Sequence, residues 1–235
     1  MTKIAIMQPY LFPYIGYFQL INAVDRFVIY DNLQYTKKGW INRNRILING
    51  KDEYISIPLK KDSDFLDIKN RFLAQSWLTD RTKVLDKIIE SYRKSPCFKE
   101  AFPVIEKCIT LEETNLFNYI FNSIKILVEY LNIKTPFTIS STINIDHSLK
   151  AENKVITICK ALKASDYLNP IGGIELYKKE QFEKEGIQLN FIKTNNFEYK
   201  QFNNVFIPFL SIIDVMMFNE KEQIKEYLNF HYSIL

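Results

Sequence analysis

The stretch KIAIMQPYLFPYIGYFQLINAVDRFVIYD, residues 3–31, decides the fold of this chain. Residues 3–7 form a short apolar run typical of a buried strand, residues 15–24 have the apolar spacing of a short helix, and residues 26–31 form a second apolar run. A strand, a helix and a strand in this order join two parallel strands by a right-handed crossover. We therefore predict a three-layer α/β domain with a mainly parallel sheet.

The rest of the chain continues this pattern and adds two elements. RNRILING (43–50) and DEYISIPL (52–59) alternate between apolar and polar residues, and Asn49 and Gly50 tolerate the positive φ of a tight turn, so we predict a β-hairpin. Helical periods fill a helical insert at about residues 76–130. Further strands are expected at 136–141, 166–169 and 187–192, and further helices at 151–162, 175–185, 207–218 and 221–230. We expect all 235 residues to form a single α/β domain around the insert.

The composition limits the class of protein. A hydrophobic content of 47% can fill a sizeable core, and the 31 basic and 27 acidic residues are spread along the chain, so no segment is a polybasic tail. Cys97, Cys108 and Cys159 lack the spacing of metal ligands, and no cluster of acidic residues and histidine has it either. No signal peptide and no apolar run of ~20 residues is present. We expect a soluble cytoplasmic protein with no metal and no membrane insertion.

The loop after the first strand is the first candidate site. The carboxyl edge of an open parallel sheet is where such folds bind ligands, and a helix start presents free backbone N–H groups there. Gly16 would let a ligand approach the backbone, while Tyr10, Tyr14 and Tyr17 offer hydroxyls and stacking faces. The alternative is a tightly packed aromatic turn without a ligand.

The stretch DNLQYTKKGWINRNRI, residues 31–46, is the second candidate site. Arg43 and Arg45 are two of only six arginines, and strand alternation sends both side chains to one face, where they could form a fork for phosphate or carboxylate. Asn42 and Asn44 face the opposite side. The alternative is a solvated, charged hairpin edge.

Two weaker candidates follow later in the chain. Gly172 and Gly173 stand between a short strand and a predicted helix, an arrangement that cradles phosphate oxygens, although a plain helix-entry turn explains the pair equally well. His147 could act as a general base oriented by Asp146; a loop histidine is otherwise simply exposed.

Several stretches together resemble the WbqC-like family. They are residues 8–46, ISS at 139–141, YLNPIGGIELY at 167–177, FEKEGI at 182–187 and LSIIDVMMFN at 210–219. The resemblance implies a bacterial protein encoded among O-antigen and other surface-polysaccharide genes, and hence a role in modifying activated sugars.

The first loop also resembles that of His-x-Gly-His nucleotidylyltransferases. Tyr14-Ile15-Gly16-Tyr17 takes the place of the motif, and Ser140 and Ser141 are similar to part of a later phosphate-binding motif. This resemblance implies a nucleotide-binding, HUP-like domain. Tyrosine, with a reference pKa of about 10, cannot supply the imidazolium charge of the missing histidines, so ordinary adenylyl transfer is not expected.

These observations predict a transferase of surface-polysaccharide biosynthesis that moves an acyl or related group onto a nucleotide-linked sugar, with ATP or an acyl donor as co-substrate. The alternative is a protein of the same pathway that binds nucleotide or sugar and does no chemistry. Nucleic acid is not expected as a partner, since no wide basic field accompanies YTKKGWINRNRI. The sequence defines neither the donor nor the oligomeric state. The candidate catalytic residues are His147, Asp146 and Tyr17; the candidate ligand-binding residues are Gln8, Tyr10, Tyr14, Gly16, Asp31, Gln34, Tyr35, Lys38, Trp40, Asn42, Arg43, Asn44, Arg45, Ser140, Ser141, Gly172 and Gly173.

Overall fold

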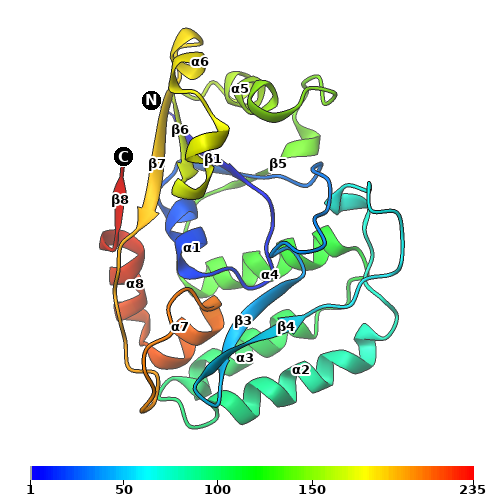
Figure 1. Cartoon of the computed structure of the whole chain (residues 1–235), viewed down its shortest axis with the longest axis vertical. Coiled ribbons are helices and arrows are strands. Elements are labelled where there is room, and N and C mark those ends of the chain that lie inside the picture. Colours follow the sequence, from blue (N-terminus) through cyan, green and yellow to red (C-terminus); the bar gives the residue numbers. More distant parts are fainter. Residues whose placement is uncertain (1) are drawn as a thin grey trace.

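A six-stranded sheet with the order β5-β2-β1-β6-β7-β8 forms the centre of the upper half of the molecule in Figure 1. The computed structural model describes residues 2–235. The first five strands in this order run parallel, and β8 is antiparallel to β7. The prediction of an α/β fold with a mainly parallel sheet is confirmed. The strands are β1 (Lys3–Met7), β2 (Arg26–Ile29), β5 (Phe137–Ile139), β6 (Asp166–Pro170), β7 (Gln188–Thr194) and β8 (Tyr232–Ile234).

The buried middle residues of β1 and β2 are apolar because helices cover both faces of the sheet. Ala5 and Phe27 belong to one buried cluster, together with residues of α1 (Ile15–Asn22), whereas Ile4 and Val28 belong to a second cluster with α5 (Ala151–Ala161). Side chains along a strand alternate between its faces, so this division follows directly from the sequence. Two layers of helices with the sheet between them fit the three-layer prediction.

The lower half of Figure 1 holds the hairpin and most of the helices. The hairpin strands β3 (Arg43–Ile48) and β4 (Lys51–Ser56) pair with each other in a separate two-stranded sheet. Asn49 and Gly50 have φ values of 50° and 75°, which confirms the predicted tight turn. The helices of this half are α2 (Trp77–Tyr92), α3 (Phe98–Ile109), α4 (Leu116–Tyr130), α7 (Ile212–Phe218) and α8 (Lys221–Phe230).

The hairpin touches the loop that follows β1 without joining the main sheet. Asn44 Nδ2 donates hydrogen bonds to the carbonyls of Leu11 and Phe12, over 3.0 and 2.8 Å, and Leu11 N donates to Ile41 O. Phe12 has a φ of 42°, a conformation that a non-glycine residue adopts at a cost, and the Asn44 contact helps to hold it. Asn44 is therefore a structural residue that joins the two halves.

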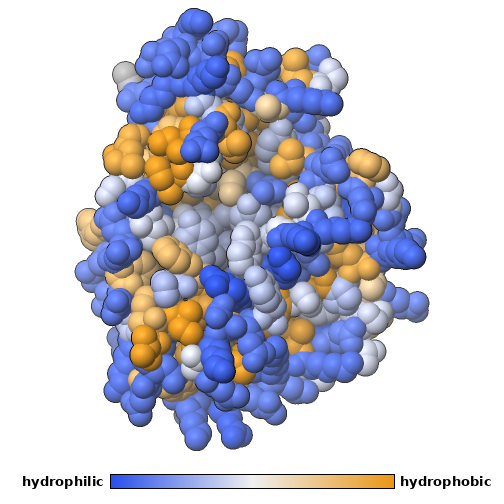
Figure 2. All heavy atoms as spheres, in the orientation of Figure 1, coloured by the Kyte–Doolittle hydropathy of each residue, from blue (hydrophilic) through white to orange (hydrophobic). Residues whose placement is uncertain are grey.

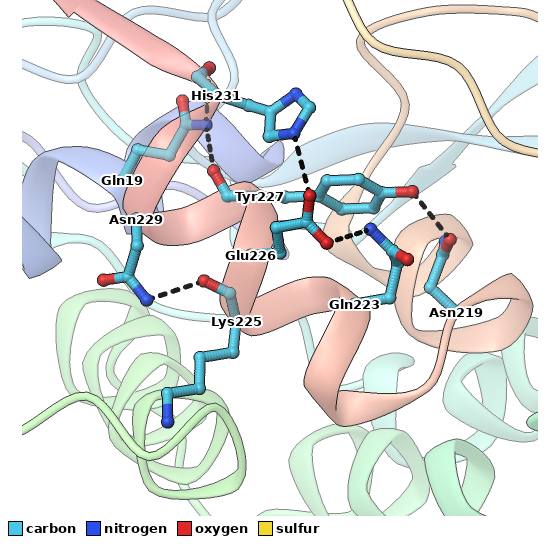
Figure 3. Close-up of polar contacts among 8 residues, drawn as sticks. All are labelled: Gln19, Asn219, Gln223, Lys225, Glu226, Tyr227, Asn229 and His231. Atoms are coloured by element: carbon cyan, nitrogen blue, oxygen red, sulfur yellow. Dashed lines mark hydrogen bonds and ion pairs between the residues drawn. The ribbon is translucent and has the colours of Figure 1, made fainter.

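The C-terminal helix is fixed to the sheet layer by one buried amide, drawn in Figure 3. Gln19 on α1 donates to the carbonyls of Tyr227 and His231, over 2.8 and 3.0 Å, at the end of α8. Its Oε1 accepts from Thr194 Oγ1 at the end of β7. These bonds add to the backbone donors that the two carbonyls already have, His231 N for Tyr227 O and Asn195 N for His231 O. They also position the segment that continues into β8, a strand that local patterns did not predict.

Two predicted helices differ from those observed. The stretch 175–185 divides into a 3-10 helix at Ile171–Leu176 and a short helix α6 at Lys179–Lys184. The apolar helix predicted from residue 207 begins only at Ile212, where Ser211 caps it by accepting from Ile213 N. Pro208 and Phe209, which has a φ of 57°, keep the preceding residues out of the helix. Within residues 2–235, no helix has both the length and the apolar character needed to cross a membrane.

Candidate functional site

A cleft of about 700 Å³ opens at the carboxyl edge of the parallel sheet. It is lined by residues of three segments, 30–34 after β2, 65–69, and 147–154 at the start of α5. The strands β2 and β5 lie side by side and end at Ile29 and Ile139, so the loops that follow them meet here. The face drawn in Figure 2 is hollowed between the half that carries the sheet and the half that carries the hairpin.

Asp31 links the two segments that follow β2 and β5 at this cleft. The side chain is buried, and its carboxylate accepts hydrogen bonds from Ser141 N at 2.9 Å, Ser140 Oγ at 3.0 Å and Ser141 Oγ at 2.5 Å. The Ser140 hydroxyl also contacts Asn32 Oδ1. Asp31, Ser140 and Ser141 were predicted to bind ligand, and the structure brings them together. They use their polar atoms on one another and tie β2 to the loop after β5.

His147 lines the cleft in a defined tautomer. Its Nε2 lies 2.9 Å from the carbonyl of Ile143, which can only accept a hydrogen bond, so Nε2 carries the proton. Nδ1 is then free to accept from Asn32 Nδ2, also over 2.9 Å. The neutral imidazole thus presents its basic nitrogen toward Asn32.

The prediction that Asp146 orients His147 is wrong. Asp146 Oδ1 accepts from Ser148 N and Ser148 Oγ, over 2.9 and 2.7 Å, because the turn at this point folds the carboxylate onto the residue two positions later. These two bonds lower the pKa of Asp146 below its usual value, although burial acts in the opposite direction. Asn32 and Ile143 orient the imidazole instead.

Lys154 is the most informative cleft residue that the sequence patterns missed. It lies in the first turn of α5, is 5% exposed, donates to the carbonyl of Asn32 over 3.3 Å, and lies over the ring of Tyr30. Burial lowers the pKa of its ammonium, while the charges of Asp67 and Asp31 act in the opposite direction. No carboxylate of residues 2–235 lies within ion-pair distance of it.

The cleft is suited to an anion. Lys69 and Lys150 also line it, and the helix start at Ala151 adds the positive end of a helix dipole. Asp67 is a lining carboxylate. Because unpaired cations around a hollow raise the local positive potential, this edge favours phosphate groups of a ligand.

The first loop uses its aromatic residues mostly for packing. Tyr17 is 3% exposed and donates to Gln8 O over 3.1 Å, and burial raises the pKa of its phenol well above the ordinary value. A buried, neutral phenol with its proton already donated does not reach a substrate. Gln8 Nε2 donates to Tyr10 OH over 2.7 Å. A side chain on Gly16 would overlap Thr194 Oγ1 and the ring of Tyr14, so protein atoms occupy the space predicted for a ligand.

A second hollow, of about 250 Å³, collects five of the predicted ligand residues. Its walls are Tyr10, Tyr14, Trp40, Asn44 and Arg45, together with Pro13 and Phe209. The first loop and the hairpin therefore meet at this hollow, although the hairpin is not part of the main sheet.

The two hairpin arginines share a face, as predicted, but neither guanidinium is a free fork. Arg45 pairs with Asp52 over 2.8 Å and lies over the ring of Trp40. Arg43 lies over the ring of Tyr54, and donates from Nε to Gly39 O over 3.1 Å and from Nη2 to Lys38 O over 2.6 Å. The contacts of Arg43 hold the turn that precedes the hairpin.

A third hollow, of about 560 Å³, contains Tyr35 and Asn42. Tyr35 OH donates to Asn42 Oδ1 over 2.8 Å, and Asn42 Nδ2 donates to Ile57 O. Gln34 lines the first cleft and donates to Asp64 O over 3.0 Å.

Gly172 and Gly173 stand apart from all three hollows, at the end of β6. Both lie inside the 3-10 helix Ile171–Leu176, so the prediction that they open an α-helix is wrong. A side chain on Gly173 would overlap the amide of Asn169, whereas Gly172 has open space beside it. Close packing explains one of the two glycines.

Comparison with known proteins identifies a family that matches most of the chain. Residues 8–226 match the model of the WbqC-like protein family. An uncharacterized protein of Mycobacterium tuberculosis, Rv1507c, is 30% identical over 234 residues, which are 98% of this chain and 99% of that protein. No solved structure matches the chain. The matched range includes the first loop, the hairpin and the residues around all three hollows.

Proposed function

The chain belongs to the WbqC-like family, and we propose that it is a cytoplasmic enzyme of bacterial surface-polysaccharide (O-antigen) biosynthesis that modifies a nucleotide-linked sugar. The reaction proposed is the transfer of an acyl or related group to an amino or hydroxyl substituent of the sugar. The observation that carries the proposal is that the buried ammonium of Lys154, which has no carboxylate partner, and the imidazole of His147 line one cleft and both contact Asn32.

The cleft fits the ligand in size and charge. Its volume of about 700 Å³ lies within the ~300–1,000 Å³ typical of small-molecule sites. The diphosphate would lie against Lys69 and against Lys150 and Lys154 at the start of α5. The sugar would extend toward His147. An anion at Lys154 would supply the counter-charge that this buried ammonium lacks.

His147 is the proposed general base. Attack of a sugar amine or hydroxyl on an acyl thioester forms the new bond to the carbonyl carbon, breaks the carbon–sulfur bond and releases a proton from the nucleophile. Nδ1 can take that proton once the substrate displaces the amide of Asn32, because Nε2–H stays bonded to Ile143 O and fixes the ring. The thiolate leaving group then takes this proton from Nδ1, which returns the imidazole to its neutral form.

The second candidate is a protein that binds a nucleotide or sugar without chemistry. Two observations favour this candidate. Both ring nitrogens of His147 already have hydrogen-bond partners in the protein, and tyrosines stand at positions 14 and 17, where the His-x-Gly-His motif has its catalytic histidines.

Incubation of the purified protein with UDP- and dTDP-linked amino sugars, and with acetyl coenzyme A or with ATP and acetate, distinguishes the two candidates. Mass spectrometry of the sugar nucleotide should show the gain of one acyl group, and the His147→Gln variant should bind the sugar nucleotide but form much less product. Binding without product in every combination would favour the second candidate. Failure to bind any sugar nucleotide would contradict both.

A further inference from the structure

The hollow that contains Tyr35 and Asn42 is separate from the cleft at the sheet edge. The segments around Gln34 and Asp67 pair through a bridge, and Tyr35 N donates to Leu66 O over 3.0 Å. Side chains along such a pair alternate: Gln34 lines the cleft at the sheet edge, whereas Tyr35 lines this hollow. The paired segments thus form a wall between two separate cavities.

Arg71 is the buried cation of this second cavity. It is 4% exposed and lines the hollow; its Nη1 donates to Ser63 O over 2.7 Å, and its guanidinium lies 4.8 Å from the ring centre of Tyr35. Its Nε is buried and has no hydrogen-bond partner. No carboxylate of residues 2–235 lies within ion-pair distance of Arg71. A guanidinium stays charged at all ordinary pH values, so the folded protein buries a charge without a counter-ion.

The rim of the cavity carries further positive charge. Lys60 and Lys61 are exposed lining residues, and Lys37, which also lines the cavity, pairs with Asp64 over 2.8 Å. Asp62 and Asp64 are the two carboxylates of the lining, so the four cations outnumber them. Burial raises the pKa of the Tyr35 phenol, and the charges of Arg71, Arg43 and Lys37 lower it, with a smaller opposing effect from Asp64. Positive charge therefore converges on the Tyr35 hydroxyl from several elements.

We propose that this cavity is a second binding site, which takes a phosphate group of a small molecule. Arg71 presents its guanidinium to the phosphate oxygens, and Lys60 and Lys61 contact a further phosphate at the rim. The phosphate supplies the counter-charge that the buried guanidinium lacks. The site is separate from the sheet-edge cleft and does not depend on the function proposed there.

Calorimetric titration with inorganic phosphate and with pyrophosphate, at constant ionic strength, tests the site. Pyrophosphate should bind more tightly than phosphate, because it reaches both Arg71 and the rim. The double variant Lys60→Gln/Lys61→Gln changes only exposed residues and should weaken pyrophosphate binding about tenfold or more. The matched control Lys99→Gln/Lys107→Gln removes two exposed charges from α3 and should leave the affinity unchanged.

Arg71→Met separates a binding role from a structural one. If Arg71 is a ligand-binding residue, the variant loses phosphate binding and keeps its melting temperature, because an apolar residue replaces an uncompensated charge. A lower melting temperature with unchanged binding would overturn the proposal. So would the absence of binding by the wild-type protein, or an equal loss in the control pair. Loss of binding in Lys154→Met but not in the rim variant would place the phosphate in the other cleft and also overturn it.

Discussion

Asn32 donates a hydrogen bond from its side-chain amide to Nδ1 of His147 over 2.9 Å, and so joins the end of β2 to the loop before α5. The two residues are far apart in sequence and meet only because β2 and β5 are neighbours in the sheet. This contact, together with the Ile143 carbonyl, sets the tautomer of the imidazole in the cleft.

Replacing Asn32 with Asp should add a second proton to the imidazole of His147. The amide donor becomes a carboxylate acceptor, which requires a proton on Nδ1 while Ile143 still requires one on Nε2. Nitrogen NMR at neutral pH should show a neutral Nε2–H ring in the wild-type protein and a doubly protonated ring in Asn32→Asp. The same neutral tautomer in both proteins would mean that Asn32 does not control the ring.

The second prediction concerns a buried acid outside the cleft. Asp214 is fully buried; its Oδ1 accepts from Tyr92 OH, and its Oδ2 accepts from Tyr199 OH and Gln201 Nε2. Burial raises its pKa above the ordinary 3.8, although the three donors act in the opposite direction. Above pH 3.8 the folded state therefore holds this proton more firmly than the unfolded state does.

The free energy of unfolding should accordingly carry a component from Asp214 that is fully present below pH 3.8 and is lost as the pH rises through the folded-state pKa. Asp214→Asn, which cannot titrate, should lack that component. Urea titrations of both proteins across this pH range test it. Parallel pH profiles would show that Asp214 does not contribute.

Gln19 should stabilise the C-terminal helix strongly for a single amide. Gln19→Met keeps the volume but removes the hydrogen bonds to the carbonyls of Tyr227 and His231. Each carbonyl keeps a backbone donor, His231 N and Asn195 N respectively, so the cost should be about 0.5–1.5 kcal/mol for each hydrogen bond lost. Asn22→Ala, which removes only an exposed contact with Asn229, is the control and should cost less than about 0.5 kcal/mol. Equal destabilisation of the two variants by urea unfolding would refute the role of Gln19.

Two glycines should respond to alanine in opposite ways. Gly16→Ala forces Thr194 or the Tyr14 ring to move and should destabilise the fold by about 1–3 kcal/mol. Gly172→Ala meets no atom and restricts the unfolded chain, so it should be neutral or stabilise the fold by up to about 1 kcal/mol. Thermal unfolding of the pair checks this. A harmless Gly16→Ala would mean that the space beside α1 is open after all, as the sequence had suggested.

Local patterns predicted most of the fold. Apolar runs located the parallel strands, and Asn49-Gly50 located the hairpin turn, because buried strands and tight turns are encoded by neighbouring residues. The separation of the hairpin from the main sheet and the addition of β8 depend on contacts between distant segments. The hydrophobic periodicity of a short stretch carries no information about such contacts.

The candidate site was harder to predict for the same reason. Arginine is scarce in this chain, and that signal led to Arg43 and Arg45. Their guanidinium groups are already bonded to other groups of the protein. Applied to Arg71, the same signal would have found a buried guanidinium without a carboxylate partner among residues 2–235. Lys154 gave no signal in a lysine-rich sequence, because only the folded chain shows that it is buried beside the sheet edge.

The most direct test of the proposed function is the affinity for a UDP-linked amino sugar of two variants on the same helix. Lys154→Met removes the buried ammonium of the cleft, whereas Lys160→Met removes an exposed one that pairs with Glu185. Calorimetry should show at least about tenfold weaker binding for Lys154→Met, the scale of a charge-assisted hydrogen bond, and wild-type affinity for Lys160→Met. Equal affinities of Lys154→Met and the wild-type protein would contradict the assignment of the sheet-edge cleft as the nucleotide-sugar site.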